Sequence, residues 1–433
     1  MAQRLRSGIA TAAMRGAGQS WPLHPGAEWI NFNLLWAAAL LVGALARSQR
    51  DRRLMFRLKI LILYMMVLLP VLLVLGSLPP ATAQGVTMTR LSSAGGGIFV
   101  DSGQALGGET GNGVALGDLD GDGDTDAFVA NEFGLDGANQ LWFNKGDGVF
   151  ASGPTLGATT GNAAALGDLD EDGDLDAIVA MLSPISAMVW MNQGGAQGGN
   201  EGDFAPGISL GSFSGYGVAI GDVDNDGDLD ALVVGNSNQV WLNNGDATFS
   251  AGPALPFLFS EAVALADLDD DGWLDAAIAD SGSGTSNRVY WNDGNWEPGP
   301  GSFTQGDALP TGSLALGVAV ANLDADDQPD IFLAASGQDQ VYWNEGARNF
   351  TAGAPLPVSD SSTALAVADV DGDGLLDAVV GNIHAEPNRV WRNKGGRTFA
   401  VIQEFGDEFG LYWSRGLGLS DLNGDGSADL FEV

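Results

Sequence analysis

The chain has 433 residues and 45% of them are hydrophobic, so it is able to bury a large core and is not a disordered acidic tail. It has no cysteine, which excludes disulfides, thiolate metal sites and a cysteine nucleophile. Residues 84–433 carry 9 Lys and Arg against 53 Asp and Glu, a net charge of −44, which repels nucleic acid and attracts cations.

The first 83 residues contain two apolar runs, residues 33–46 and 60–78, with a cluster of basic residues between them. Ala81-Thr82-Ala83 follows the second run, and this order predicts a secretory signal that is cleaved after Ala83. Met55 is an alternative start, because the sequence from there is a complete signal peptide by itself. The second run also approaches the ~20 residues of a membrane-spanning helix, so an uncleaved anchor is the rival interpretation. Either topology places residues 84–433 outside the cytoplasmic membrane, and membrane contact is expected only through an uncleaved N-terminal segment.

An aspartate-rich stretch, GDLDGDGDTDAFVAN at residues 117–131, recurs along the remaining chain. We number the seven copies loops 1 to 7, and their first residues are Asp118, Asp168, Asp222, Asp267, Asn322, Asp369 and Asp421, spaced 45 to 55 residues apart. A strand is predicted before each loop and another after it. A third strand carries phrases such as QVWLNNG, and a fourth begins at a phenylalanine, as at Phe150 and Phe204. Four short strands per unit are typical of a propeller blade.

The last repeat stops at Val433 inside its second strand, and the missing half lies at the other end of the repeat region. Residues 86–103 match a third and fourth strand, with Phe99 at the phenylalanine position. We therefore expect the N-terminal strands to complete the C-terminal blade and to close a seven-bladed, all-β propeller over residues 84–433. Closure removes the open ends of the ring, which a β protein must protect.

Numbered from its first residue, each loop carries acidic or amide side chains at positions 1, 3, 5 and 9, and glycine at position 6 in six of seven loops. The alternation points oxygens inward, and the turn at position 6 brings in the carbonyl oxygen of position 7, a set that suits Ca²⁺. An EF-hand requires a Glu at position 12 and flanking helices. The first six loops have Val, Ile or Leu at position 12 and β-rich flanks, so the EF-hand is excluded. The predicted metal residues at positions 1, 3, 5, 7 and 9 are Asp118, Asp120, Asp122, Asp124 and Asp126; Asp168, Asp170, Asp172, Asp174 and Asp176; Asp222, Asp224, Asp226, Asp228 and Asp230; Asp267, Asp269, Asp271, Trp273 and Asp275; Asp369, Asp371, Asp373, Leu375 and Asp377; and Asp421, Asn423, Asp425, Ser427 and Asp429.

These motifs resemble FG-GAP repeats, the calcium-binding blades of the integrin alpha propeller and of related bacterial secreted proteins. The resemblance covers about residues 84–433 and implies Ca²⁺ in the loop between the first two strands of each blade. Loop 5 departs from the pattern at Asn322, Asp327 and Pro329, and we expect weak binding or none there. About six calcium sites are therefore predicted.

The propeller topology places the seven loops on one face, so a partner site of the integrin kind is expected on the other. Its candidate contacts are Phe133, Tyr216, His384, Tyr412 and Trp413, although aromatic residues near blade ends commonly pack between blades and a single loop histidine is commonly solvated. We assign the repeated tryptophans Trp142, Trp190, Trp241 and Trp391 to the core. Trp296 stands in a Gly/Pro-rich insertion and is predicted to be exposed on the loop face. Arg389, Arg392, Lys394 and Arg397 are expected to neutralise neighbouring acids.

Two functions follow from this reading. The first is a secreted or surface-attached calcium-binding propeller that binds an extracellular protein or glycan, with no catalytic residues and no nucleic-acid partner. The second is a polysaccharide-active, lyase-like enzyme, which only fold analogy supports. A single histidine after residue 83 and the absence of a Ser–His–Asp set favour the first.

Overall fold

The computed structural model describes residues 86–91, 99–106, 110–133, 138–157, 160–194, 198–200, 202–256, 259–281, 287–296, 301, 303–384, 386–406 and 413–433. The predicted signal or anchor, its cleavage after Ala83 and the alternative start at Met55 lie outside these residues and stay predictions. Within the described part of the chain every regular element is a strand, and no helix there is suited to crossing a membrane.

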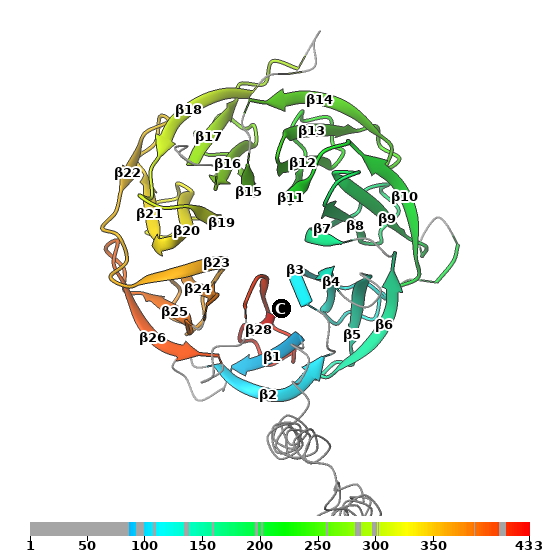
Figure 1. Ribbon diagram of the computed structural model, residues 1–433, viewed down its shortest axis with the longest axis horizontal. Coiled ribbons are helices and arrows are strands. Elements are labelled where there is room, and N and C mark those ends of the chain that lie inside the picture. The colour runs from blue at the N-terminus through cyan, green and yellow to red at the C-terminus, as the bar shows by residue number, and fades with distance from the viewer. Residues whose placement is uncertain are drawn as a thin grey trace, which may run out of the picture. The chain divides into compact units, whose positions relative to one another are not determined.

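The strands form repeated antiparallel sheets, and we number the repeating units by the loop that each contains (Figure 1). Unit 1 has β3 (Thr110–Gly117), β4 (Asp126–Phe133), β5 (Asn139–Asn144) and β6 (Phe150–Leu156). Unit 2 has β7 (Gly161–Gly167), β8 (Asp176–Met181), β9 (Ala187–Asn192) and β10 (Phe204–Leu210). Unit 3 has β11 (Gly215–Gly221), β12 (Asp230–Gly235), β13 (Asn238–Asn243) and β14 (Phe249–Leu255), and unit 4 has β15 (Ser260–Ala266), β16 (Asp275–Asp280), β17 (Asn287–Asn292) and β18 (Phe303–Leu309).

Units 5 and 6 are joined into one eight-stranded sheet. Unit 5 has β19 (Ala315–Ala321), β20 (Asp330–Gln338), β21 (Gln340–Asn344) and β22 (Phe350–Ala352), and unit 6 has β23 (Ser359–Ala368), β24 (Asp377–Asn382), β25 (Asn388–Asn393) and β26 (Phe399–Phe405). The end of β20 pairs with the start of β23, from Ser336↔Ser361 to Gln338↔Ser359. Backbone hydrogen bonds thus link these two units directly.

The two ends of the repeat region form one sheet with the strand order β2-β1-β28-β27, as expected. This unit 7 has β27 (Leu417–Ser420), β28 (Asp429–Glu432), β1 (Val86–Leu91) and β2 (Phe99–Leu106). The register runs from Thr87↔Glu432 to Thr89↔Leu430. The first strands of neighbouring units also contact one another in a closed circle, β3–β7–β11–β15–β19–β23–β27–β3. The predicted pairing of the chain's two half-units is therefore present.

The hydrophobic core lies between neighbouring sheets. Each cluster of buried side chains draws residues from two successive units; for example, Leu119 and Phe128 of unit 1 pack with Val179 and Trp190 of unit 2. The second strand of a unit is buried along its whole length, as in β8, β12 and β24, because it has a neighbouring sheet on both faces. The fourth strand begins at the predicted phenylalanine in every unit, from Phe99 to Phe399.

The tryptophans divide between confirmed core positions and one correction. Trp190 and Trp391 are buried, while Trp142 and Trp241 are half-buried against the clusters next to them. The prediction that Trp296 is exposed is wrong, because only 7% of it is accessible. Its indole Nε1 donates to Asn292 Oδ1 at 3.0 Å, and its ring meets Phe303 edge to face. Composition alone marked Trp296 as a surface residue, but its ring has a polar partner and an aromatic neighbour within its own unit.

Candidate metal centres and the central cavity

The first residue of each loop shapes the turn by accepting hydrogen bonds from the loop backbone. In loop 1, Asp118 Oδ1 accepts from the amide of Gly121 at 2.8 Å and Oδ2 from that of Gly123 at 2.9 Å. The amide of position 6 reaches the position-1 carboxylate in the same way in five further loops, at 2.8–3.0 Å. Position 6 is left-handed in all seven loops, for example Gly227 at φ 104°, which explains the preference for glycine.

Position 4 is left-handed as well, from Gly121 at φ 73° to Asn225 at φ 56°. This second turn is harder to predict from the sequence, because Glu171, Asp270 and Ala325 occupy the position in other loops. Together the two left-handed residues turn the chain sharply within each loop.

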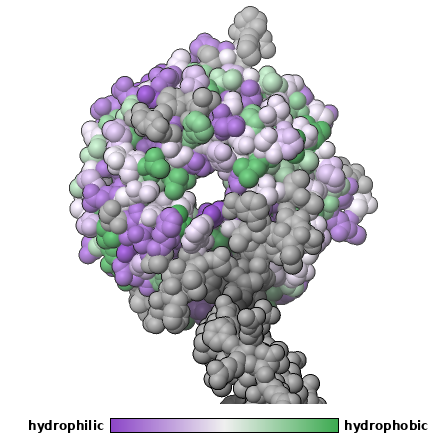
Figure 2. Space-filling model, viewed as in Figure 1, coloured by the Kyte–Doolittle hydropathy of each residue, from purple (hydrophilic) through white to green (hydrophobic). Residues whose placement is uncertain are grey.

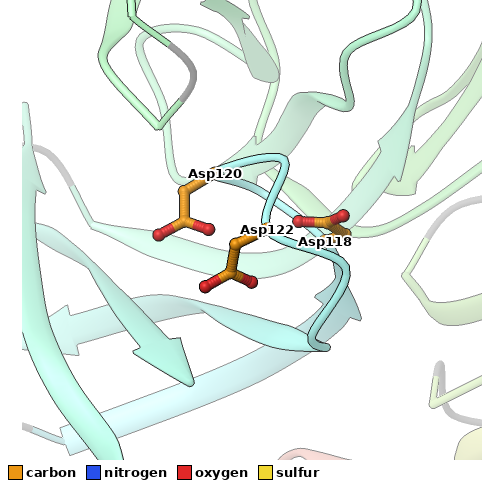
Figure 3. Close-up of side chains that lie close together, drawn as sticks. All are labelled: Asp118, Asp120 and Asp122. Carbon is orange, nitrogen blue, oxygen red and sulfur yellow. The ribbon is translucent and has the colours of Figure 1, made fainter. Parts of the chain in front are cut away.

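Five loops gather three carboxylates whose oxygens lie within 4.8 Å of one another. Figure 3 shows the first triad, which comes from the single turn between β3 and β4. The triads are Asp118, Asp120 and Asp122; Asp168, Asp170 and Asp176; Asp222, Asp224 and Asp226; Asp267, Asp269 and Asp271; and Asp369, Asp371 and Asp377. Like charges at this separation repel each other unless a cation or protons lie between them.

The carboxylate oxygens at position 3 show whether a cation would fit in the loops. Asp120 Oδ1 and Asp224 Oδ1, and likewise Asp324 Oδ1 in loop 5, are buried and have no hydrogen-bond partner among the described residues. A buried carboxylate oxygen without a donor is costly, and a missing ion is one of its ordinary explanations. Burial and the neighbouring Asp226 raise the pKa of Asp224 to about 6, and burial followed by Asp122 raises the pKa of Asp120. An all-oxygen donor set of this kind fits a hard divalent cation of the size of calcium.

Position 7 was predicted to supply a carbonyl oxygen. Its amide donates to the position-5 carboxylate, as in Asp228 N to Asp226 Oδ1 at 3.0 Å and Leu375 N to Asp373 Oδ1 at 2.9 Å. This bond orients the peptide between positions 6 and 7, and the carbonyl role of the position-7 residues stays a prediction in all six loops: Asp124, Asp174, Asp228, Trp273, Leu375 and Ser427.

Position 9 has a structural role that the sequence did not reveal. Asp230 is fully buried; its Oδ2 accepts from the amide of Val223 at 2.9 Å, and its Oδ1 accepts from the amide of Asn243 at 2.9 Å. The aspartate therefore connects its own loop to the third strand, and the same pair of bonds recurs in units 1 to 6. Burial raises the pKa to about 7 for Asp176, Asp230 and Asp275, and to about 6 for Asp126, Asp330 and Asp377.

Loops 5 and 7 form no such triad among the described residues. In loop 5, Asn322 Oδ1 accepts from the amide of Asp326, and position 6 is Asp327 at φ 70°. In loop 7, the Asn423 amide donates to Asp429 Oδ2 at 2.6 Å, while Asp421 shapes the turn as in the other loops.

Sequence reasoning missed a repeated asparagine that ties each unit to the preceding loop. Asn243 Nδ2 donates to the carbonyl of Leu169 in loop 2 at 2.7 Å and to that of Leu229 in its own loop at 3.2 Å, while its Oδ1 accepts from Gly245. The equivalent residues are Asn144, Asn192, Asn292, Asn344 and Asn393. The repeated Asn of the third-strand phrase was the available signal. By register Leu91 occupies this place in unit 7, so that unit has no asparagine there.

The face opposite the loops opens into a central cavity of about 440 Å³, and Figure 2 shows an opening at the centre of the ring. The starts of the seven first strands line it. The lining residues six positions before each loop are chemically varied: Asn112, Asn162, Tyr216, Glu261, Leu316, Thr363 and Arg415. The next residue along is Gly or Ala in every unit. Arg415 donates to Asn112 Oδ1 at 2.7 Å, and Asn112 donates to Asn162 Oδ1 at 3.1 Å.

The predicted contacts of this face are partly described. Tyr216 lines the cavity, His384 is exposed, and Trp413, 46% exposed, lies 5.6 Å from His384 between ring centroids. The side chains of Phe133 and Tyr412 lie outside the described residues.

The fold is an all-β propeller-like repeat, and comparison with known proteins supplies its family. Models of the FG-GAP-like repeat match residues 118–179, 222–278, 267–333, 322–380 and 369–431, so the chain belongs to the FG-GAP-like repeat family. Among solved structures it resembles BBS1N in complex with ARL6DN, at 11% identity and a TM-score of 0.51, over 80% of this chain and 97% of that one. It also resembles a protein from Lactobacillus plantarum at 14% identity and a TM-score of 0.51, over 74% of this chain and 95% of the other. No curated protein matches the sequence.

Proposed function

We propose that residues 84–433 form a seven-bladed, calcium-stabilised propeller that works outside the cytoplasmic membrane as a non-catalytic binding module for a protein or glycan. The closed circle of first strands and the pairing of β1 with β28 support seven blades. The unpartnered oxygens of Asp120 and Asp224 support calcium in the loops. The order of basic, apolar and small residues before Gln84 supports export.

Calcium has the role that disulfides have in other extracellular domains. At ~2 mM calcium and a dissociation constant of ~0.1 mM, each site adds about 1.8 kcal/mol to the free energy of unfolding. We expect calorimetry to count about six sites and calcium, but not magnesium, to raise the melting temperature of the calcium-stripped protein. No calcium effect would contradict the metal part of the proposal.

The observation that carries the binding role is the placement of exposed apolar side chains. Phe259, Leu314 and Trp413 are 53%, 45% and 46% exposed, and each lies eight residues before its loop, on the face that surrounds the cavity. Phe259 also has a left-handed backbone at φ 72°, a conformation that costs energy for an aromatic residue. Exposed apolar side chains at one repeat position, around a cavity with varied polar walls, are typical of a recognition surface.

A double variant, F259A together with W413A, tests this surface. Glycan arrays and protein capture first identify a ligand of the wild-type full chain. We expect the double variant to bind that ligand at least tenfold more weakly. V149A is the matched control, because Val149 is 48% exposed but lies in the β5–β6 hairpin on the loop face. Equal loss in both variants would place the site elsewhere, and depolymerisation of a polysaccharide by the full chain would favour the lyase-like enzyme instead.

A further inference from the structure

Three loops hold a guanidinium group against the carboxylates at positions 3 and 5. Arg397 Nε lies 2.6 Å from Asp324 Oδ2 in loop 5, and its Nη2 lies 3.8 Å from Asp326 Oδ2. Arg348 pairs with Asp269 and lies 3.5 Å from Asp271 Oδ2 in loop 4. Arg392 lies 2.5 Å from Asp371 Oδ2 and 3.0 Å from Asp373 Oδ2 in loop 6. In each case the position-3 side chain is almost completely buried.

Two of these arginines come from the unit that follows the loop. Arg348 and Arg397 each lie two residues before the phenylalanine that begins a fourth strand. The same place holds Gly148, Gly202, Ala247 and Gly301 in other units. Glycine and alanine carry no side-chain charge, so in these units no cation extends from this position to the preceding loop. Units 5 and 6 are thus distinguished from units 1 to 4 at this position.

The backbone at this position is left-handed in all six of these units. It has φ 63° at both Arg348 and Arg397, close to φ 70° at Gly148 and φ 83° at Gly202. An arginine is strained there and a glycine is not.

A tryptophan accompanies each of these two arginines. The Arg348 guanidinium lies 5.0 Å from the centre of the Trp291 ring, and Arg397 lies 5.4 Å from that of Trp343. Trp291 and Trp343 immediately precede the repeated asparagine, where units 1 to 3 have Phe143, Met191 and Leu242. The aromatic platform and the arginine therefore occur together, and the ring fixes the plane of the guanidinium over the loop.

The geometry points to a division of the ring: we propose that Arg397 takes the place of the divalent cation in loop 5, and that Arg348 and Arg392 lower the calcium affinity of loops 4 and 6. Loop 5 lacks a carboxylate triad, and a planar guanidinium is able to bridge two carboxylates. Loops 4 and 6 retain triads, so there the arginine competes with calcium through charge repulsion. This inference rests on the proposed calcium binding of the other loops.

A consequence is that units 4 to 6 form an arc whose links do not depend on calcium. Arg348 joins unit 5 to loop 4, Arg397 joins unit 6 to loop 5, and the pairing of β20 with β23 joins units 5 and 6. Removal of calcium should therefore loosen units 1 to 3 before it loosens this arc.

Hydrogen exchange of the full chain, in calcium-saturated and calcium-stripped buffer, tests the proposal peptide by peptide. We expect the loop 5 peptide of the wild type to exchange at the same rate in both buffers, within twofold. Peptides of loops 1 and 3 should exchange at least tenfold faster after stripping. R397Q should accelerate exchange in loop 5 at least tenfold in both buffers, because it leaves Asp324 buried without its partner. K394Q is the matched control, since Lys394 is an exposed cation of the same hairpin.

The outcomes separate the two proposals. Acceleration of wild-type loop 5 on stripping, or equal behaviour of R397Q and K394Q, would overturn the role of Arg397. If loops 1 and 3 do not respond to stripping, the calcium proposal fails, and the comparison of R397Q with K394Q in stripped buffer still decides the arginine. If R397Q does not fold, R348Q provides a second variant. Calcium titration of R348Q should show the same number of sites as the wild type, with one site binding about tenfold more tightly. An unchanged affinity would refute the competition.

Discussion

Replacement of Asn243 by alanine tests whether the repeated asparagine holds neighbouring units together. The side chain is buried, at 4% exposure, and its amide donates to the carbonyls of Leu169 and Leu229 while its oxygen accepts from Gly245. N243A removes all three bonds at once. The two carbonyls belong to loops 2 and 3, so the change weakens the contact between units 2 and 3 as well as the loop of unit 3.

The expected size of the effect follows from the groups left without a partner. Each buried polar group that loses its bond costs about 1–3 kcal/mol, and water entering the space left by the side chain reduces this. We therefore expect the free energy of unfolding to fall by about 3 kcal/mol. A chain of this size shifts by roughly 2 °C per kcal/mol, which gives a melting temperature lower by about 6 °C.

Thermal unfolding of the full chain in saturating calcium measures the shift, with N244A as control. Asn244 is the next residue, is exposed and bonds only within its own hairpin, to Thr248 and Ser250, so its replacement should stay within about 0.5 kcal/mol of the wild type. Melting temperatures of N243A and N244A within 1 °C of each other would refute the idea that this amide connects the units.

Three further perturbations have expected outcomes. Because burial raises the pKa of Asp176, Asp230 and Asp275 to about 7, above the usual 3.8, these groups stabilise the metal-free fold at low pH and lose this contribution as the pH rises through about 7. Calcium-stripped protein should therefore melt higher at pH 5 than at pH 7.5, and the calcium-induced rise in melting temperature should be larger at pH 7.5; a calcium-induced rise that is independent of pH would contradict this. G227A should lower the free energy of unfolding by about 1–2 kcal/mol and weaken one calcium site, because φ is 104° at Gly227. N225G in the same loop, where φ is 56°, should not destabilise the protein, and denaturant titration compares the two variants. W296A should lower the free energy of unfolding by about 3–5 kcal/mol in the same titration, as expected for a core aromatic residue. A decrease under 1 kcal/mol would show that Trp296 is not part of the core.

Features that depend on short stretches of chain could be predicted from the sequence. The alternating aspartates, the left-handed glycine at position 6 and the phenylalanine that begins each fourth strand are local signals, and their repetition indicated the strand order within each unit. The pairing of β1 with β28 was also predictable, because two incomplete repeats at opposite ends of a region complement each other.

The contacts between groups far apart in the sequence depend on how the sheets pack. Asn243 and Leu169 are 74 residues apart, and Arg397 and Asp324 are 73 apart, so neither pair follows from local pattern. The burial of Trp296 and the two backbone hydrogen bonds of each position-9 aspartate, as at Asp230, likewise depend on surrounding strands. In each case the groups meet, and water is excluded from around them, only once the strands and sheets have packed together.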